Sequence, residues 1–429
     1  TETSISKDIK RNNEIDVGIT HEYTVTITFK NRSYLQNDNL NKSFSGKIDL
    51  EEYVDPSPEA VYCTFDGTLT QGAEYVNGQY TYKYMQEGKY ADSGLAWQNI
   101  TSDGWGVQLT DKASTNAVTS KVCTYINNVP ITSMSYMFSD SKATTLDVSN
   151  FDTSNVTNMH SMFYNSQATT IDVSNFDTSN VTNMKVMFGN SQATTLDVSN
   201  FDTSNVTDMG QMFESSQATT LDLSNFDTSK VTSMVNMFYY SNATTIDVSN
   251  FNTSKVTTMN SMFWDSQATT LDVSNFDTSK VTDMYCMFYR SKATTLDVSN
   301  FDTSNVTNMS NMFASSQATT LDVSNFNTSK VTNMSNMFAS SQATTLDVSN
   351  FNTSKVTNMD SMFDSSTNLK TIYGSSKFVT TAVTSSADMF IGCTNLVGGA
   401  GTKYDNNHVD KEYARIDGGT SNPGYFTSK

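Results

Sequence analysis

The 429-residue sequence is short of histidine, of basic residues and of long apolar runs, and each shortage narrows what the protein can do. Its three histidines, His21, His160 and His408, stand in separate regions, so the sequence indicates neither a histidine-based triad nor a zinc site. It has 26 Lys and Arg against 44 Asp and Glu, and this net charge of −18 argues against nucleic-acid binding, which needs clustered cations. No apolar run approaches the roughly 20 residues that span a membrane, so we expect no membrane insertion.

Cysteine is scarce too, with four in the chain. Cys63 and Cys123 bracket a β-rich stretch, and we predict a disulfide between them in an oxidising compartment; two unpaired buried thiols are the alternative. The chain starts at Thr1 without Met, which leads us to expect a processed or trimmed extracellular segment. No phosphate-binding glycine loop is present, and we predict neither an enzyme nor a bound cofactor.

What the chain has in place of such features is a tandem repeat of 25 residues. From Ala143 it reads ATTLDVSNFDTSNVTNMHSMFYNSQ and then starts again, in nine near-identical copies. A strict period of this length is typical of a solenoid, in which each unit buries its apolar face only against its neighbours. Leu146 and Val148 alternate with polar residues as in a half-exposed strand, and no helical periodicity outlasts one turn. We predict a mainly β fold, a parallel β-solenoid of leucine-rich-like repeats over residues 143–367.

The flanking segments depart from the repeat, as the ends of a solenoid must. We expect residues 121–142 to form a degenerate N-terminal capping coil, and residues 368–429 to form degenerate last coils and a glycine-rich C-terminal cap. Residues 1–120 share nothing with the repeat. Alternation over Tyr23–Phe29 and a hairpin signal at Asn77-Gly78 predict an N-terminal all-β, sandwich-like domain there.

The unit LDVSNFDTSNVTNMxxMF resembles the BspA-like leucine-rich-repeat family of bacterial surface proteins. The resemblance runs from about residue 100 to the end, and includes GWGVQLTDK before the repeats and YARIDGGTSNPGYF after them. It implies a secreted, cell-surface protein that adheres to host or matrix components, mucus or neighbouring cells. Many relatives carry Cys after the Met-Phe pair, where this chain has serines such as Ser141 and Ser166, and only Cys393 follows Phe390 in the family manner.

Positions that differ between copies are where we expect a partner to bind, because the repeated positions serve the fold. They are the pair after Met159, the pair after Phe163 and the residue before each Ala-Thr-Thr. Three consecutive repeats carry aromatic residues at the first position after the Phe. Aromatic and Arg side chains on a rigid platform suit protein or sugar recognition. The alternative is that the rings merely cover the edge of the Met-Phe core. The predicted ligand-binding residues are Tyr239, Tyr240, Trp264, Tyr285, Tyr289 and Arg290.

A column of aspartates, Asp147 and its copies as far as Asp347, should stack at strand spacing and repel. Solvation, hydrogen bonds to Ser and Thr, or bound Ca²⁺ would relieve the repulsion, and because no Ca²⁺ loop motif is present we predict no metal site. Near-identical carboxylates also do not make the one uniquely shaped site that a glycoside hydrolase needs. The aspartates between Thr144, Thr145 and their copies likewise disfavour an ice-binding threonine array.

We therefore predict a secreted or cell-surface bacterial adhesin or interaction scaffold whose partner is an extracellular protein or glycan, with no nucleic-acid partner. The alternative is structural, a spacer or a self-associating subunit of a surface filament or pilus. Truncation of Tyr239, Trp264 and Tyr289 would abolish binding in the first case and change nothing in the second.

Overall fold

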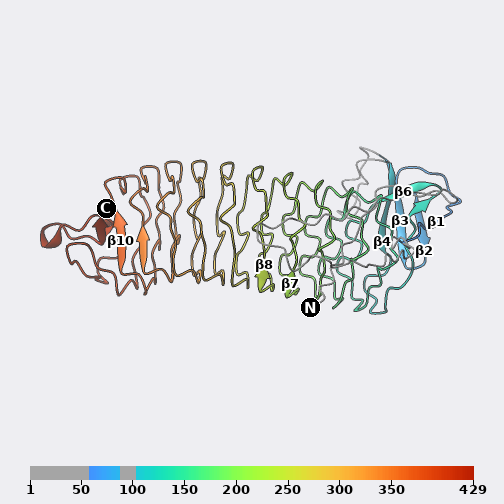
Figure 1. Cartoon of the computed structure of the whole chain (residues 1–429), viewed down its shortest axis with the longest axis horizontal. Coiled ribbons are helices and arrows are strands. Elements are labelled where there is room, and N and C mark those ends of the chain that lie inside the picture. The colour runs from blue at the N-terminus through green and yellow to red at the C-terminus, as the bar shows by residue number, and fades with distance from the viewer. Residues whose placement is uncertain (1–57, 87–102) are drawn as a thin grey trace, which may run out of the picture. The chain divides into compact units, whose positions relative to one another are not determined.

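The computed structural model describes residues 58–86 and 103–429, and Figure 1 shows their course. The chain divides into two compact units, Thr1–Asp55 and Pro56–Lys429, of which the first lies outside the described residues. The strand predicted over Tyr23–Phe29 falls outside them as well, so that part of the N-terminal domain stays a prediction.

The described residues are mainly β and contain almost no helix, as the sequence predicts. The strands are β1 (Tyr62–Cys63), β2 (Glu74–Asn77), β3 (Tyr80–Met85), β4 (Gly104–Leu109), β5 (Tyr125–Ile126), β6 (Val129–Ser133), β7 (Thr220–Leu221), β8 (Thr245–Ile246), β9 (Thr345–Asp347), β10 (Thr371–Gly374) and β11 (Phe426–Ser428). Two 3-10 helices, η3 (Lys411–Tyr413) and η4 (Gly419–Ser421), complete this part of the chain. Neither is long or apolar enough to span a bilayer, and no other helix among these residues is either.

A six-stranded sheet, in the order β1-β5-β6-β4-β3-β2, forms the N-terminal part of the second unit. β2 and β3 pair antiparallel around Asn77-Gly78, where Gly78 has a φ of 57°, so the hairpin predicted from this dipeptide is confirmed. β4 pairs antiparallel with β3 and parallel with β6, which lies in the segment 121–142. Strands that the sequence analysis assigned to a domain ending at residue 120 therefore share one sheet with the first capping coil.

This sheet also shares its apolar core with the repeats. Tyr80 and Tyr82 alternate inward along β3 and are fully buried. The centroid of the Tyr80 ring lies 6.5 Å from that of Phe138 and 6.0 Å from that of Phe151, both of which belong to the first coils. The core is consequently continuous from the sheet into the coils.

Each 25-residue repeat forms one coil, and each coil bonds the next at the same phase of the repeat. Parallel bridges join Asn158 to Asn183 and recur every 25 residues as far as Asn358. Figure 1 shows the coils following one another in sequence order. Extended segments within them are short, since β7 and β8 pair over only two residues. The turn formed when Asp147 Oδ1 accepts from the Ser149 amide, at 3.1 Å, helps to end such a segment early.

Columns of identical apolar residues fill the space inside the coils, as predicted. The central column consists of phenylalanines whose rings stack nearly parallel, with centroids of successive rings 5.4–5.9 Å apart. They are Phe138, Phe163, Phe188, Phe213, Phe238, Phe263, Phe288, Phe313, Phe338, Phe363 and Phe390. All of these rings are fully buried, and so are the methionines that precede them. Close packing of this kind makes each coil depend on both of its neighbours.

Polar side chains bond the coils together at the corners. The amide of Asn175 donates to the carbonyl oxygen of Ser149 in the preceding coil at 2.9 Å, and Asn200 repeats the bond to Ser174 at 2.7 Å. Thr182 Oγ1 donates to the Thr157 carbonyl at 3.2 Å, one rung of a threonine ladder. The corner asparagines thus serve the backbone, as the sequence suggests.

The last coil is covered by the C-terminal segment. β10 pairs parallel both with β9 of the last repeat and with β11. The buried rings of Tyr425 and Phe426 pack edge-on against Phe390, the last ring of the phenylalanine column. The ammonium group of Lys429 bonds the carboxylate of Asp347, which ties the C-terminus to the repeats.

Candidate functional site

The side chains that differ most between coils gather on one face because of the local backbone. In each coil the chain passes twice through the left-handed region, for example at Ser161 and Asn165, both with a φ of 53°. Met162 and Phe163, which lie between these two residues, are fully buried. The amide of Ser161 donates to the carbonyl of Lys185 at 2.9 Å, so the same segment of the next coil lies alongside. We call the positions equivalent to 160, 161, 164 and 165 the variable face.

The aromatic residues predicted as a binding site meet on this face. The ring centroid of Trp264 lies 5.2 Å from that of Tyr239 and 4.7 Å from that of Tyr289, which come from the coils on either side. Tyr285 approaches Trp264 to 6.4 Å, and Tyr240 approaches Tyr239 to 4.6 Å. We call these five residues the aromatic cluster.

A charged pair flanks the aromatic cluster. The guanidinium of Arg290 lies 3.3 Å from a carboxylate oxygen of Asp265, and the Arg290 side chain is 48% exposed whereas that of Asp265 is 9% exposed. Tyr240 is exposed, and the other four aromatic side chains of the cluster are half-buried. The aromatic cluster therefore has one exposed ring, four half-buried rings and the half-exposed Arg290 beside them.

Two tyrosines of the aromatic cluster, Tyr239 and Tyr285, have a raised pKa. A hydrogen bond with Cys286, together with burial, raises the pKa of Tyr285 to about 12. Burial raises the pKa of Tyr239 as well. The indole Nε1 of Trp264 is buried and has no hydrogen-bond acceptor among the described residues. The Tyr239 and Tyr285 hydroxyls are thus neutral donors at neutral pH, and the buried indole N–H of Trp264 is unpaired.

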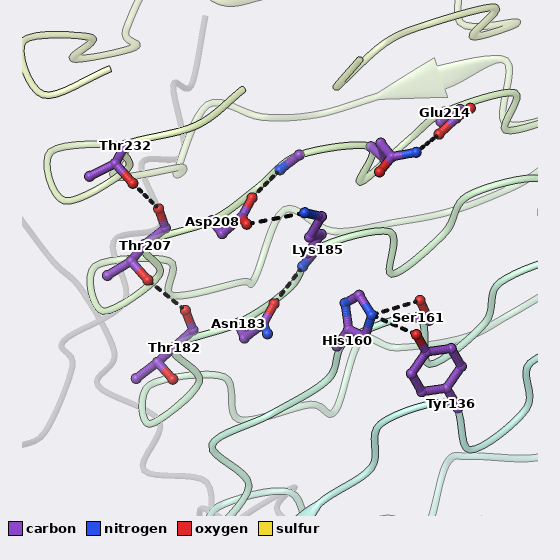
Figure 2. A network of polar contacts seen from close by, with 12 residues as sticks. Tyr136, His160, Ser161, Thr182, Asn183, Lys185, Thr207, Asp208, Glu214 and Thr232 are labelled. Carbon is purple, nitrogen blue, oxygen red and sulfur yellow. Dashed lines mark hydrogen bonds and ion pairs between the residues drawn. The ribbon is translucent and has the colours of Figure 1, made fainter. Parts of the chain in front are cut away.

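A hollow of about 620 Å³ lies on the same face, in earlier coils. The sequence analysis named the variable positions but did not recognise this hollow. The sequence feature that could have indicated the hollow is the first position after the Met, which is His160, Lys185 and Gly210 in three successive repeats. Figure 2 shows His160 beside Tyr136 and Ser161, and Lys185 reaching toward Asp208. The lining residues are Tyr136, His160, Ser161, Tyr164, Asn183, Lys185, Val186, Asp208 and Gln211.

The titratable groups of the hollow leave it close to neutral. Burial lowers the pKa of His160, and the Lys185 charge lowers it further, so the imidazole is uncharged at neutral pH. The imidazole Nε2 lies 2.9 Å from the Tyr136 hydroxyl oxygen, while Nδ1 is buried and has no partner among the described residues. The Lys185 ammonium lies 3.6 Å from a carboxylate oxygen of Asp208, so the two charges offset each other.

Serine side chains bond the aspartates of the column. Ser149 Oγ donates to Asp147 Oδ1 at 2.6 Å, and the same bond recurs between Ser249 and Asp247. Such bonds from Ser249, from both its hydroxyl and its amide, lower the pKa of Asp247. Within residues 58–86 and 103–429, no group of three His, Cys, Asp or Glu side chains is placed to hold a metal ion.

The four cysteines fall into two kinds. Cys63 and Cys123 form a disulfide with their Cα atoms 5.9 Å apart, which joins β1 to the segment before β5. Cys286 and Cys393 are buried free thiols, and burial raises the pKa of each to about 12. Because the thiolate is the reactive form of cysteine, neither of these two is a nucleophile at neutral pH.

The sequence family described as "Mycoplasma protein of unknown function, DUF285" matches this chain in three overlapping stretches, residues 132–243, 215–322 and 291–401. Together they cover more than half of the chain, including most of the coils and both parts of the variable face described above. No curated protein and no solved structure is significantly similar to the chain.

Proposed function

We propose that this chain, which belongs to the DUF285 family, is an adhesin or interaction scaffold on the bacterial surface, as the resemblance of its repeat unit to BspA-like surface proteins implies. In this proposal it is secreted, is not an enzyme, and binds an extracellular protein or glycan through the aromatic cluster. The coils would act as a parallel β-solenoid that holds the cluster rigid. Parallel bridges at 25-residue intervals support that architecture.

The observation that carries the proposal is that the fold does not need the rings of the aromatic cluster. Ala314 and Ala339 occupy the phase of Tyr239, Trp264 and Tyr289 in other coils. Phe313 and Phe338, which precede these alanines, are as fully buried as Phe263, which precedes Trp264. The aromatic rings are therefore not required to cover the phenylalanine column.

Aromatic side chains in this setting favour binding. They contribute a large contact area and lose little conformational entropy when a partner covers them. In the aromatic cluster, the rings of Tyr239, Trp264 and Tyr289 already restrain one another at 4.7–5.2 Å between centroids, which lowers that cost further. Arg290, half-exposed beside them, adds donors suited to carbonyl and carboxylate groups.

The test is a matrix-protein and glycan array probed with the chain and with a Tyr239→Ala/Trp264→Ala/Tyr289→Ala triple variant. Each change introduces the residue that the repeat already carries at Ala314 and Ala339, so the fold should persist. We expect the triple variant to lose at least about ten-fold in affinity for the ligand, because truncating an anchoring ring typically costs more than 1 kcal/mol.

The control is Asp364→Ala, a change at the same phase of the repeat in a coil outside the aromatic cluster. It should bind like the parent chain. Equal binding by the triple variant would remove the aromatic cluster from the proposal. If nothing on the arrays is bound and the chain self-associates in light scattering, the spacer or filament function would replace adhesion.

A further inference from the structure

Two glycines of the variable face lie beside residues that line the hollow around His160. Gly189 follows Tyr164 at the first position after the Phe, and Gly210 follows Lys185 at the first position after the Met. A Cβ atom at Gly189 would lie 2.8 Å from Val186 Cγ1 and 3.2 Å from Tyr164 Cδ2. Any side chain at position 189 would thus enter the space between Tyr164 and Val186. The glycines keep this part of the face open.

The groups that line the hollow retain hydrogen-bonding capacity. A neutral imidazole has one donor and one acceptor nitrogen, and His160 uses only Nε2, with the hydroxyls of Tyr136 and Ser161. Lys185 and Asp208 are 3.6 Å apart, which is longer than a good hydrogen bond, and their side chains are 41% and 34% exposed. Both partners of this pair can therefore bond a ligand without first giving up a strong bond.

The charges around the hollow do not favour an anionic ligand. Lys185 and Asp208 offset each other. Glu214, whose carboxylate accepts from the side-chain amide of Gln211, adds further negative charge at the edge of the lining. Lys185 is the one cation of the lining and Asp208 offsets its charge, so the lining has no net positive charge to attract a carboxylate or phosphate, and the chain as a whole carries a net charge of −18.

We propose that this hollow binds a neutral sugar unit of one or two rings. Its volume of about 620 Å³ falls within the range of sites for small ligands. Sugar hydroxyls both donate and accept, which matches a lining that mixes the donors Lys185 and Gln211 with the acceptor Asp208. The rings of Tyr136 and Tyr164 provide apolar surface for the C–H face of a sugar.

This site is separate from the aromatic cluster and goes beyond the proposed adhesion. The hollow is lined by residues between Tyr136 and Gln211, whereas the cluster begins at Tyr239. Either site can exist without the other. A single chain would then hold a small neutral sugar in one place and a larger surface partner in another.

Saturation-transfer NMR tests the proposal with methyl glycosides of glucose, galactose, mannose, fucose, N-acetylglucosamine and N-acetylgalactosamine, and with lactose. Glucuronic acid and sialic acid serve as anionic comparisons. We expect at least one neutral sugar to receive saturation from the parent chain, and a His160→Ser/Lys185→Ser variant to bind it at least ten-fold more weakly. Both changes introduce the residue present at the same phase at Ser310 and Ser335, so the fold should persist, which thermal unfolding checks.

The Tyr239→Ala/Trp264→Ala/Tyr289→Ala variant is the control and should bind the neutral sugar like the parent chain. If it does not, the sugar sits at the aromatic cluster and the proposal for the hollow is wrong. Silence of the whole neutral panel, binding of the anionic sugars alone, or undiminished binding by the His160→Ser/Lys185→Ser variant would each overturn it. None of these outcomes depends on whether the array experiment finds a partner for the aromatic cluster.

Discussion

At the scale of single residues, the left-handed positions decide which side chains are free to vary. Each coil has two of them, and Asn, Ser and Asp occupy many, as at Asn165 and Ser215, because short polar side chains tolerate this conformation best. Val186 departs from this pattern, with a φ of 59° and a β-branched side chain on the edge of the hollow. Such a residue is strained where a left-handed backbone is imposed by its neighbours.

Val186→Asn should therefore stabilise the protein. Asn236 and Asn311 occupy the same phase with φ values of 55° and 59°, so the backbone already accepts Asn there. We expect the free energy of unfolding to rise by about 1 kcal/mol, measured from the urea midpoint. Val235→Asn, which lies on the same face but outside the left-handed positions, is the control and should give no gain. Equal effects at the two sites would mean that backbone strain is not the cause.

Asp417 is a second residue whose effect can be measured, through pH. Burial opposes its ionisation, but hydrogen bonds from Thr402, Gly419 and Ala400 outweigh burial and lower its pKa to about 2. Its folded pKa lies below the ordinary value of 3.8, so its contribution is complete above pH 4 and disappears as the pH falls through 2.

Asp417→Asn should cost about 2 kcal/mol at neutral pH, since hydrogen bonds to a charged acceptor are lost. The difference between variant and parent should narrow between pH 4 and pH 2. Urea unfolding across this pH range measures both. A difference that stays constant down to pH 2 would show that the charge of Asp417 does not stabilise the cap.

At the scale of the element, each coil surrounds a buried phenylalanine, and asparagine side chains at its corners bond it to the neighbouring coil. Phe263 illustrates it, with ring centroids of Phe238 and Phe288 each 5.6 Å away on either side. Trp264, the next residue, faces outward in the aromatic cluster. Two adjacent residues of one coil thus lie on opposite sides of the backbone, Phe263 in the core and Trp264 on the variable face.

Phe263→Ala should destabilise the protein by about 3–5 kcal/mol, because the emptied volume cannot collapse between two stacked rings. Trp264→Ala should cost clearly less, since alanine already serves at Ala314 and Ala339. Urea unfolding of both variants measures the comparison. An equal loss would mean that the aromatic cluster does cover the core edge and would weaken the case for a binding site.

The local sequence was enough to predict features that are set by a residue's position within one repeat. The burial of Phe163 and the corner bonds of the asparagines follow from period and propensity, and so does the Asn77-Gly78 hairpin. The aromatic cluster was predictable because Tyr239, Trp264 and Tyr289 share one phase.

Features that depend on distant pairing were not predictable in this way. The parallel pairing of β4 with β6 joins segments that look unrelated in sequence, so the shared sheet was missed. The hollow was missed because its lining comes from several different coils and includes a histidine that stands alone in the sequence. Which side chains of neighbouring coils meet around such a hollow cannot be read from the sequence of a single repeat.

At the scale of the unit Pro56–Lys429, stability is distributed along a series of similar contacts between neighbours. The ends differ from the middle, with a six-stranded sheet at one and β9, β10 and β11 at the other. Arrays of this kind tolerate a change in the number of repeats but not the loss of an end.

Deletion of residues 318–342 should leave a folded protein, because Phe313 and Phe363 would then face each other at the spacing that any two coils have. We expect its melting temperature to fall by less than about 4 °C, measured by circular dichroism. Deletion of residues 375–429, which include β11, should in contrast expose Phe363 and give aggregates in size-exclusion chromatography. Aggregation of the first variant would show that contacts beyond the nearest coil are essential.

The sameness of the coil-to-coil bonds has a further consequence for how the chain finds its fold. Phe163 donates its amide to the Met187 carbonyl, but Met212 offers an identical acceptor 25 residues later. Skipping one coil would make the same kinds of bond at the new junction and loop out a single repeat, so the backbone bonds at that junction do not by themselves distinguish the correct arrangement from the slipped one. The variable residues, such as Trp264 or His160, are among the few residues that differ between one coil and the next. Recognition and folding therefore constrain the same variable residues, because each substitution there also changes how readily the chain slips out of register while folding.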